Sequence, residues 1–127
     1  MKLLLDTHAF LWFTAGDSHL SRRAKRAIED ARAVLLLSAA SVWEMAIKSS
    51  LGRLTLPTTA ADFLAAKLEG GLQLLPVDWT HAAAVETLPF HHRDPFDRLL
   101  IAQAAIERLT IVTSDPVFRK YGVPIVW

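Results

Sequence analysis

Short apolar runs alternate with longer segments of helical period along the whole chain. The apolar runs resemble strands that are buried on both faces of a parallel sheet. They predict strands over Lys2–Leu5, Arg32–Ser38, Leu72–Val77, Thr110–Asp115 (running into a turn) and Val123–Trp127. Segments with apolar positions three and four apart, with capping residues or glycine at their ends, predict helices. These cover Leu20–Ala31, Ser38–Gly52, Thr58–Gly71, Asp78–Leu88 and Asp94–Leu109.

Strands separated by helices imply parallel pairing through right-handed crossovers, with helices on both faces of the sheet. The predicted fold is therefore a three-layer α/β/α sandwich with a parallel sheet. We expect one domain over residues 1–127, because the chain has no evident linker, repeat or low-complexity segment.

Composition narrows the class of protein more than its function. The chain is 52% hydrophobic and 21% charged, which is typical of a globular protein, and its net charge of +1 excludes no partner. Cysteine is absent, which excludes disulfides, thiolate zinc sites and a cysteine nucleophile. No apolar run approaches the ~20 residues of a membrane span, and Asp6 interrupts the apolar start. We expect a soluble, cytoplasmic protein without membrane contact.

Four acids fall at positions where this fold places ligands. Asp6 directly follows the first strand, where it either begins a plain turn or lies at the carboxyl edge of a parallel sheet. Asp115 follows a later strand, Asp97 lies in the first turn of its helix, and Glu44 interrupts the apolar segment VWEMAI. Although far apart in sequence, these four acids can converge at one sheet edge.

Each acid also has a structural explanation. Asp94, followed by proline, is predicted to be the N-cap of its helix, and Asp97 is then favoured by the helix dipole. Asp115 has the same cap-then-proline form, and Glu44 can pair with Lys48 four residues later. Capping does not account for Glu44, so the four acids taken together favour a common site over four separate structural roles.

Carboxylates brought together repel and raise one another's pKa, and a hard divalent cation such as Mg²⁺ or Mn²⁺ reverses that cost. Such a site activates water and stabilises charge on a phosphate group. The chain has no cysteine and no G-x-S-x-G motif, which suits a site that needs no nucleophilic side chain. It also has no Gly-rich phosphate loop, which argues against nucleotide hydrolysis by that route. The hydroxyls of Thr7, Ser38 and Thr113 are placed to orient such carboxylates or waters.

Four motifs, LLLDTHAFLW, SAASVWEMAIK, HRDPFDRLLIAQA and IVTSDPVFRKYGV, occur in the order found in PIN-domain ribonucleases. The chain resembles in particular the VapC-type toxins of bacterial toxin–antitoxin pairs, and the resemblance covers nearly its whole length. It implies an endoribonuclease that depends on Mg²⁺ or Mn²⁺ and acts on RNA. The catalytic and metal-binding acids that it implies are Asp6, Glu44, Asp97 and Asp115. It also implies a homodimer and a cognate antitoxin whose tail covers the acidic site.

Other polar residues carry weaker signals. The adjacent His91 and His92 lack the spacing of a metal pair, and we interpret them as loop residues that can touch RNA. We interpret His8 as a packing residue and the basic Arg22–Arg26 segment as a solvated helix face; contact with a substrate phosphate is the alternative for both. For the antitoxin we expect a groove beside the first aromatic segment, with Trp12 in the groove and Phe13 in the core.

Two other functions compete with the ribonuclease. A receiver-like signalling domain has a similar length and an acidic Mg²⁺ pocket, but it needs two adjacent acids after its first strand and a lysine after its last. Such a domain also needs a phospho-acceptor aspartate after its third strand. Here Asp6 has no adjacent acid, the aspartate after the third strand, Asp78, begins a helix, and the late strand ends in Asp115 rather than lysine. A catalytically silent binding module is the other alternative, against which the intact acids argue.

Overall fold

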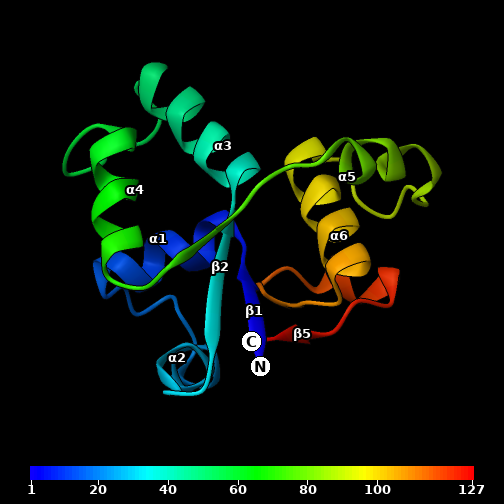
Figure 1. The fold of residues 1–127 in the computed structure, drawn as a ribbon, viewed down its shortest axis with the longest axis horizontal. Coiled ribbons are helices and arrows are strands. Elements are labelled where there is room, and N and C mark those ends of the chain that lie inside the picture. Colours follow the sequence, from blue (N-terminus) through cyan, green and yellow to red (C-terminus); the bar gives the residue numbers. More distant parts are fainter.

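The computed structural model describes all 127 residues, Met1–Trp127, and contains one sheet of five parallel strands (Figure 1). The strand order is β3-β2-β1-β4-β5, and every neighbouring pair is parallel. The strands are β1 Lys2–Leu5, β2 Val34–Ser38, β3 Gln73–Leu75, β4 Thr110–Val112 and β5 Ile125–Val126. The chain builds β2 and β3 on one side of β1 and then crosses to β4 on the other. The strand order therefore reverses between β1 and β4, and their carboxyl ends form a switch point at which ligands commonly bind.

Helices cover both faces of this sheet, as the alternating pattern predicts. They are α1 Thr7–Ala15, α2 Arg22–Glu29, α3 Ala39–Ser50, α4 Ala60–Glu69, α5 Trp79–Ala84 and α6 Pro95–Glu107. In Figure 1, helices α1–α4 lie on one side of the strands, and α5 and α6 lie on the other. The three-layer α/β/α architecture is confirmed. No helix of the structure combines the length and the apolar character needed to cross a bilayer.

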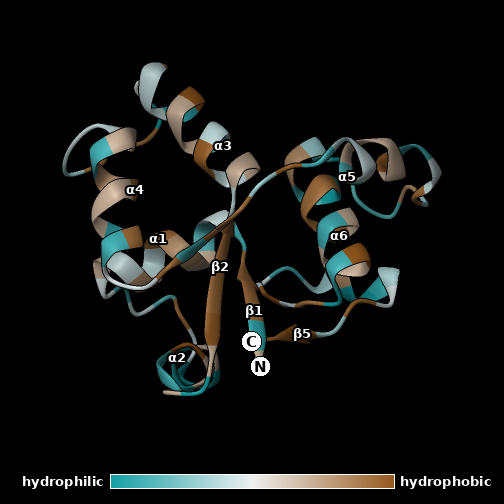
Figure 2. Cartoon of the chain, viewed as in Figure 1, coloured by the Kyte–Doolittle hydropathy of each residue, from teal (hydrophilic) through white to brown (hydrophobic).

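The central strand explains why the sequence shows leucine runs rather than alternation. Leu3 and Leu5 pack with α1, α2 and α3 on one face, while Leu4 packs with α6 on the other. All three side chains are at most 1% exposed. In Figure 2, strands β1 and β2 are mostly hydrophobic, whereas helix α2 is mainly hydrophilic. Burial on both faces removes the selection for polar residues that produces alternation.

Three local features differ from the sequence prediction. The chain forms α1 directly after β1, where the sequence pattern predicted no helix, because its residues are apolar on nearly every side and show no helical period. The segment Asp78–Leu88 divides into α5 and a 3₁₀ turn, Val85–Thr87. A second 3₁₀ segment, Pro116–Tyr121, follows β4 and was also not predicted.

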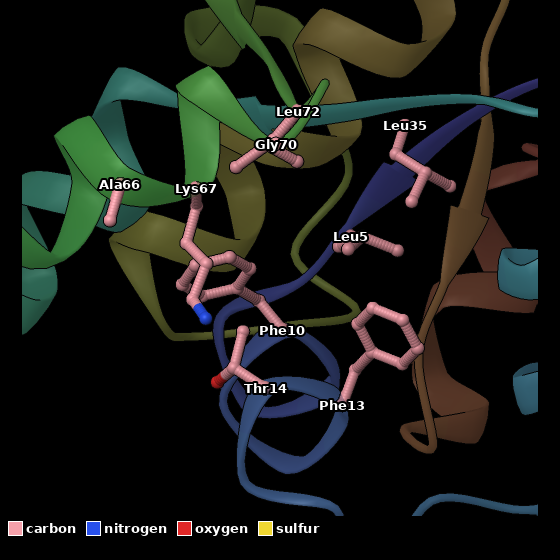
Figure 3. Close-up of a pocket in the computed structure, with 9 residues that line it drawn as sticks. All are labelled: Leu5, Phe10, Phe13, Thr14, Leu35, Ala66, Lys67, Gly70 and Leu72. Atoms are coloured by element: carbon pink, nitrogen blue, oxygen red, sulfur yellow. The ribbon is translucent and has the colours of Figure 1, made fainter.

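An apolar pocket of about 250 Å³ lies between α1 and α4 (Figure 3). Phe10 and Phe13 point into this region from α1, and Leu72 closes it beside the end of α4. Phe10 is buried, but Phe13 is only half-buried. The prediction that Phe13 belongs to the core is therefore right in part: Phe13 packs against the core cluster but also lines this pocket.

Candidate metal centre

Asp6 lies at the switch point and begins α1. Its backbone N–H donates to Val112 of β4 at 3.1 Å, so the sheet ladder fixes its position. Its carboxylate is the N-cap of α1 and accepts the N–H of Ala9 at 2.8 Å. Burial raises the pKa of Asp6 above its ordinary value of 3.8; hydrogen bonds from Thr113 and Ala9 oppose this, and the charge of Glu44 adds to it. The same aspartate therefore both starts a helix and brings a carboxyl group to the carboxyl edge of the sheet.

Glu44 projects from α3 and is 6% exposed. The Thr7 hydroxyl donates to its Oε1 at 2.6 Å, and the Lys48 ammonium contacts its Oε2 at 2.6 Å. The helix ion pair that the sequence offered as an alternative is present, but it does not lie on a solvated face. Because Thr7 directly follows Asp6, its hydrogen bond ties Glu44 to the first acid. Ser38 does not join this network and instead caps α3 through the N–H of Ala40 at 3.0 Å.

Asp94 and Asp97 have different roles in the structure: Asp94 caps α6, and Asp97 belongs to the acidic site. Asp94 caps α6, its Oδ1 accepting the N–H of Phe96 at 2.8 Å and that of Asp97 at 3.2 Å, so its predicted capping role is confirmed. The Asp97 carboxylate is left for the site. Burial, the charge of Asp94 and then the charges of Asp6 and Glu44 raise the pKa of Asp97 to about 7, which His92 partly opposes. Asp6, Glu44 and Asp97 are thus close enough to act on one another electrostatically.

His92 joins Asp115 to Asp97. Its Nε2 lies 2.7 Å from Oδ2 of Asp115 and 3.1 Å from Oδ2 of Asp97. The other oxygen of Asp115, Oδ1, accepts the N–H of Val117 at 2.9 Å and caps the 3₁₀ segment Pro116–Tyr121. Both oxygens of Asp115 are therefore engaged within the protein, whereas Asp97 retains an oxygen free of such contacts.

The hydrogen-bond partners of His92 assign its tautomer. Its Nδ1 accepts the backbone N–H of Asp94 at 3.1 Å, and a backbone N–H can only donate. Nδ1 therefore carries the lone pair, and Nε2 carries the proton that is donated to the two carboxylates. The ring also packs edge-on against Phe118, and the His92 N–H donates to the Tyr121 hydroxyl at 2.8 Å. His92 thus orients two acids from a loop position. No pattern in the sequence distinguishes it from its neighbour His91.

The donor set fits a hard divalent cation. Carboxylates from three different elements lie close enough together for the charges of Asp6 and Glu44 to raise the pKa of Asp97, and burial together with this repulsion favours protonation of Asp97 and Asp6. A divalent ion is the ligand that relieves this repulsion, and carboxylates are the groups that Mg²⁺ and Mn²⁺ prefer.

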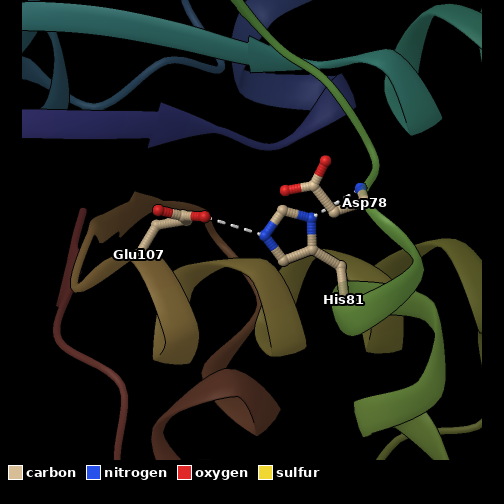
Figure 4. Close-up of side chains that lie close together, drawn as sticks. All are labelled: Asp78, His81 and Glu107. Carbon is tan, nitrogen blue, oxygen red and sulfur yellow. Dashed lines mark hydrogen bonds and ion pairs between the residues drawn. The ribbon is translucent and has the colours of Figure 1, made fainter.

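A second cluster has a structural role. Asp78, His81 and Glu107 lie together on α5 and α6 (Figure 4). His81 is 1% exposed, its Nε2 lies 3.0 Å from Glu107, and its Nδ1 accepts the Asp78 N–H at 3.0 Å. Because both ring nitrogens are engaged, this histidine fastens α5 to α6.

The family model of the PIN domain matches residues 3–124. The chain belongs to the PIN-domain family. It is 31% identical over 123 residues to Ribonuclease VapC22 of Mycobacterium tuberculosis, a match that covers 96% of this chain and 93% of that protein. The receiver-like alternative is therefore wrong, and the four motifs indicated the correct family.

Solved structures share the fold of this PIN domain. It aligns with VapC20 of Mycobacterium tuberculosis, a toxin that cleaves the sarcin-ricin loop, at a TM-score of 0.69 and 20% identity over 95% of each chain. It also aligns with VapBC2 of Rickettsia felis bound to a promoter DNA fragment, at a TM-score of 0.70 and 14% identity over 98% of this chain and 96% of that one. These matches show that the chain shares the fold of VapC and VapBC proteins over nearly its whole length.

The stability of the metal-free PIN domain is expected to fall as pH rises from about 4 through about 7. Asp97 binds its proton more tightly in the folded protein, with a pKa of about 7 against 3.8, so the stability gained from that proton is complete below 3.8 and lost above 7. Urea unfolding in EDTA at pH 5 and pH 8 measures this difference. The difference should be smaller in Asp97→Asn, and an equal pH dependence in both proteins would contradict the electrostatic account.

Proposed function

We propose that this protein is a metal-dependent endoribonuclease that acts in the cytoplasm as the toxin of a toxin–antitoxin pair. The observation that carries the proposal is the convergence of Asp6, Glu44 and Asp97 at the switch point of the sheet. The relatives agree with it, because one is named a ribonuclease and another a toxin that cleaves an RNA loop. The chain lacks a cysteine nucleophile, so activation of water suits it.

Asp6, Glu44 and Asp97 are the residues that would hold Mg²⁺ or Mn²⁺. Asp115, the fourth acid implied by the PIN resemblance, is proposed to act through His92, because its Oδ2 contacts Nε2 of His92 at 2.7 Å and that nitrogen in turn contacts Asp97 at 3.1 Å. A divalent ion bound there would lower the pKa of a water molecule and offset negative charge on the scissile phosphate.

The protein's own residues orient this centre. Thr7 and Lys48 hold the two oxygens of Glu44. The Lys48 side chain is 40% exposed, so its ammonium also offers a positive charge to an RNA phosphate. His92 holds Asp97 from the opposite side. Together these contacts keep the carboxylates aligned without requiring any side chain to act as a nucleophile.

Replacing His92 with Ala is expected to weaken Mn²⁺ binding and RNA cleavage by roughly 10- to 100-fold, the usual effect of losing a residue that orients a metal ligand. His92→Gln, which retains an N–H donor, should recover part of this loss. The control is His91→Ala, since His91 is exposed and contacts Tyr121 rather than an acid. Equal Mn²⁺ affinity in His92→Ala and the wild type would contradict the positioning role.

The toxin proposal requires an antitoxin, and the surface beside α1 offers it a site. Trp12 is half-buried and stacks between His8 and His19, at ring distances of 5.6 and 5.4 Å. With Phe63 of α4 it lines an open groove of about 400 Å³. We propose that an amphipathic antitoxin segment lays apolar side chains here and extends an arginine to the acids.

Trp12→Ala and Asp6→Asn should separate these two contributions. Trp12→Ala should weaken antitoxin binding by at least about tenfold, as loss of a buried aromatic anchor does, and leave cleavage largely intact. Asp6→Asn should abolish cleavage and weaken antitoxin binding only modestly. Co-purification with the product of the neighbouring open reading frame measures the first effect, and loss of both properties in Trp12→Ala would argue against a separate groove.

We also propose a homodimer. The side chains of Trp79 and Phe90 are 81% and 82% exposed, and large exposed apolar side chains often mark interaction surfaces. A symmetric pair is the commonest way for a chain to cover such a surface with its own copy. A monomer in light scattering at tens of micromolar, roughly a working concentration, would count against it.

The whole proposal is tested by producing the protein in bacteria. Wild type should arrest growth and leave fragments of cellular RNA, whereas Asp6→Asn should do neither. Co-production of the neighbouring small protein should restore growth. Harmless overproduction of folded wild-type protein would remove the toxin assignment even though the fold stands.

A further inference from the structure

Two aromatic side chains border the acidic centre. Trp43 on α3 directly precedes Glu44, and Phe96 on α6 directly precedes Asp97. Their rings lie 5.4 Å apart and meet edge to face at 67°. The pair therefore bridges the two helices that carry these acids.

The exposure of Trp43 is not required by packing. Its side chain is 62% exposed, while Phe96 is half-buried and supports it from one side. A single exposed apolar residue is ordinary, but here the indole is held by a second ring beside carboxylates that we assign to catalysis. An aromatic ring that is already held in place loses little conformational entropy when a ligand stacks on it.

We infer that Trp43, supported by Phe96, is a stacking platform for an unpaired nucleobase next to the phosphate that is cleaved. The inference rests on the proposed endoribonuclease function and adds to it a specificity-determining contact, which would favour RNA with an unstacked base over a duplex. Unpaired RNA bases stack on aromatic side chains, whereas bases within a duplex are already stacked on their neighbours.

The charges around the platform suit this substrate. Lys48 lies on the same helix as Trp43, and the exposed Arg93 lies just before the start of α6. Such cations contact the phosphates of a bound strand, and a divalent ion held by the acids would offset further charge on its backbone. An apolar partner surface would gain little from these charges.

The test compares binding of two labelled probes by fluorescence anisotropy, with cleavage disabled by Asp97→Asn in every protein. The probes are a 12-nucleotide single-stranded RNA of mixed sequence and the blunt duplex of the same sequence. Adding Trp43→Leu should weaken single-strand binding by about tenfold, and adding Trp43→Phe should weaken it by about threefold or less. Duplex binding should be unchanged by either substitution.

The matched control is Leu51→Ala, which removes a side chain of similar exposure, 59%, from the far end of the same helix. It should leave the affinity for both probes unchanged. Trp43→Leu with Asp97 intact should bind Mn²⁺ as the wild type does, which shows that Glu44 is undisturbed. Because Trp43 is mostly exposed, Trp43→Leu should also keep the wild-type circular dichroism and melting temperature. If it does not, Phe96→Leu takes its place, and it should weaken single-strand binding severalfold.

Three results would overturn the inference. They are unchanged single-strand binding in Trp43→Leu, an equal loss for single strand and duplex, or dissociation of a dimer in light scattering, which would make this surface a contact between copies of the chain. Failure of the proposed function looks different, because the wild-type protein would then cleave no RNA in the presence of Mn²⁺.

Discussion

Asp97→Asn is expected to reduce RNA cleavage by at least about 10²- to 10³-fold, the effect of removing a group that stabilises charge in the transition state. The substitution keeps the size of the side chain and removes a carboxylate whose pKa is raised by the charges of Asp6 and Glu44. Stability without metal should stay level or rise, because electrostatic repulsion is relieved. Initial rates on one labelled RNA, with a thermal melt of each protein, measure both effects.

Asp94→Asn is the matched control for this substitution. Asparagine is as good an N-cap as aspartate, so α6 should begin normally while one negative charge is lost three residues from Asp97. Its cleavage rate should stay close to that of the wild type. If Asp97→Asn cleaved normally and Asp94→Asn did not, the assignment of the third acid would be wrong.

The other acids should rank according to their contacts. Asp6→Asn and Glu44→Gln should be as damaging as Asp97→Asn, since both carboxylates are buried at the centre. Asp115→Asn should have a smaller effect, because we assign that carboxylate to orienting His92, which in turn contacts Asp97.

Removal of divalent metal is the second change with a large expected effect. EDTA should reduce cleavage to background, and Mg²⁺ or Mn²⁺ should restore it, because carboxylates alone cannot activate water next to an anionic phosphate. Added Mn²⁺ should also raise the melting temperature at pH 8, where Asp97 is mostly ionised, since a ligand that binds only the folded state stabilises it. Cleavage that persists in EDTA after dialysis would contradict this account, as would a melting temperature that Mn²⁺ does not change.

Most of the fold was accessible from the sequence because its signals are local. Leucine runs at Leu3–Leu5 and Leu35–Leu37 predicted strands buried on both faces, and the cap Asp94 with Pro95 predicted where α6 begins. Helix α1 was missed because its apolar residues surround the helix and leave no period of 3.6 residues.

The site was accessible in part for the same reason. Asp6 and Asp97 could be placed because each lies at an end of a predicted element, and Glu44 because it interrupts an apolar helix. The contacts of His92 with Asp97 and Asp115 could not, since they depend on the path of a loop that has no repeating pattern. The Trp43–Phe96 pair likewise depends on how α3 and α6 approach each other, which neither helix specifies alone.

The most direct test of the central claim, that these acids form a metal centre, is a calorimetric titration of Mn²⁺ at pH 8 into the wild type, Asp6→Asn, Asp97→Asn and Asp62→Asn. Asp62 lies on α4, is exposed, and serves as the control for loss of a negative charge. We expect saturable binding to the wild type and to Asp62→Asn, with affinity at least about tenfold weaker in Asp6→Asn and Asp97→Asn. Equal affinity in all four proteins, or no binding to the wild type, would contradict it.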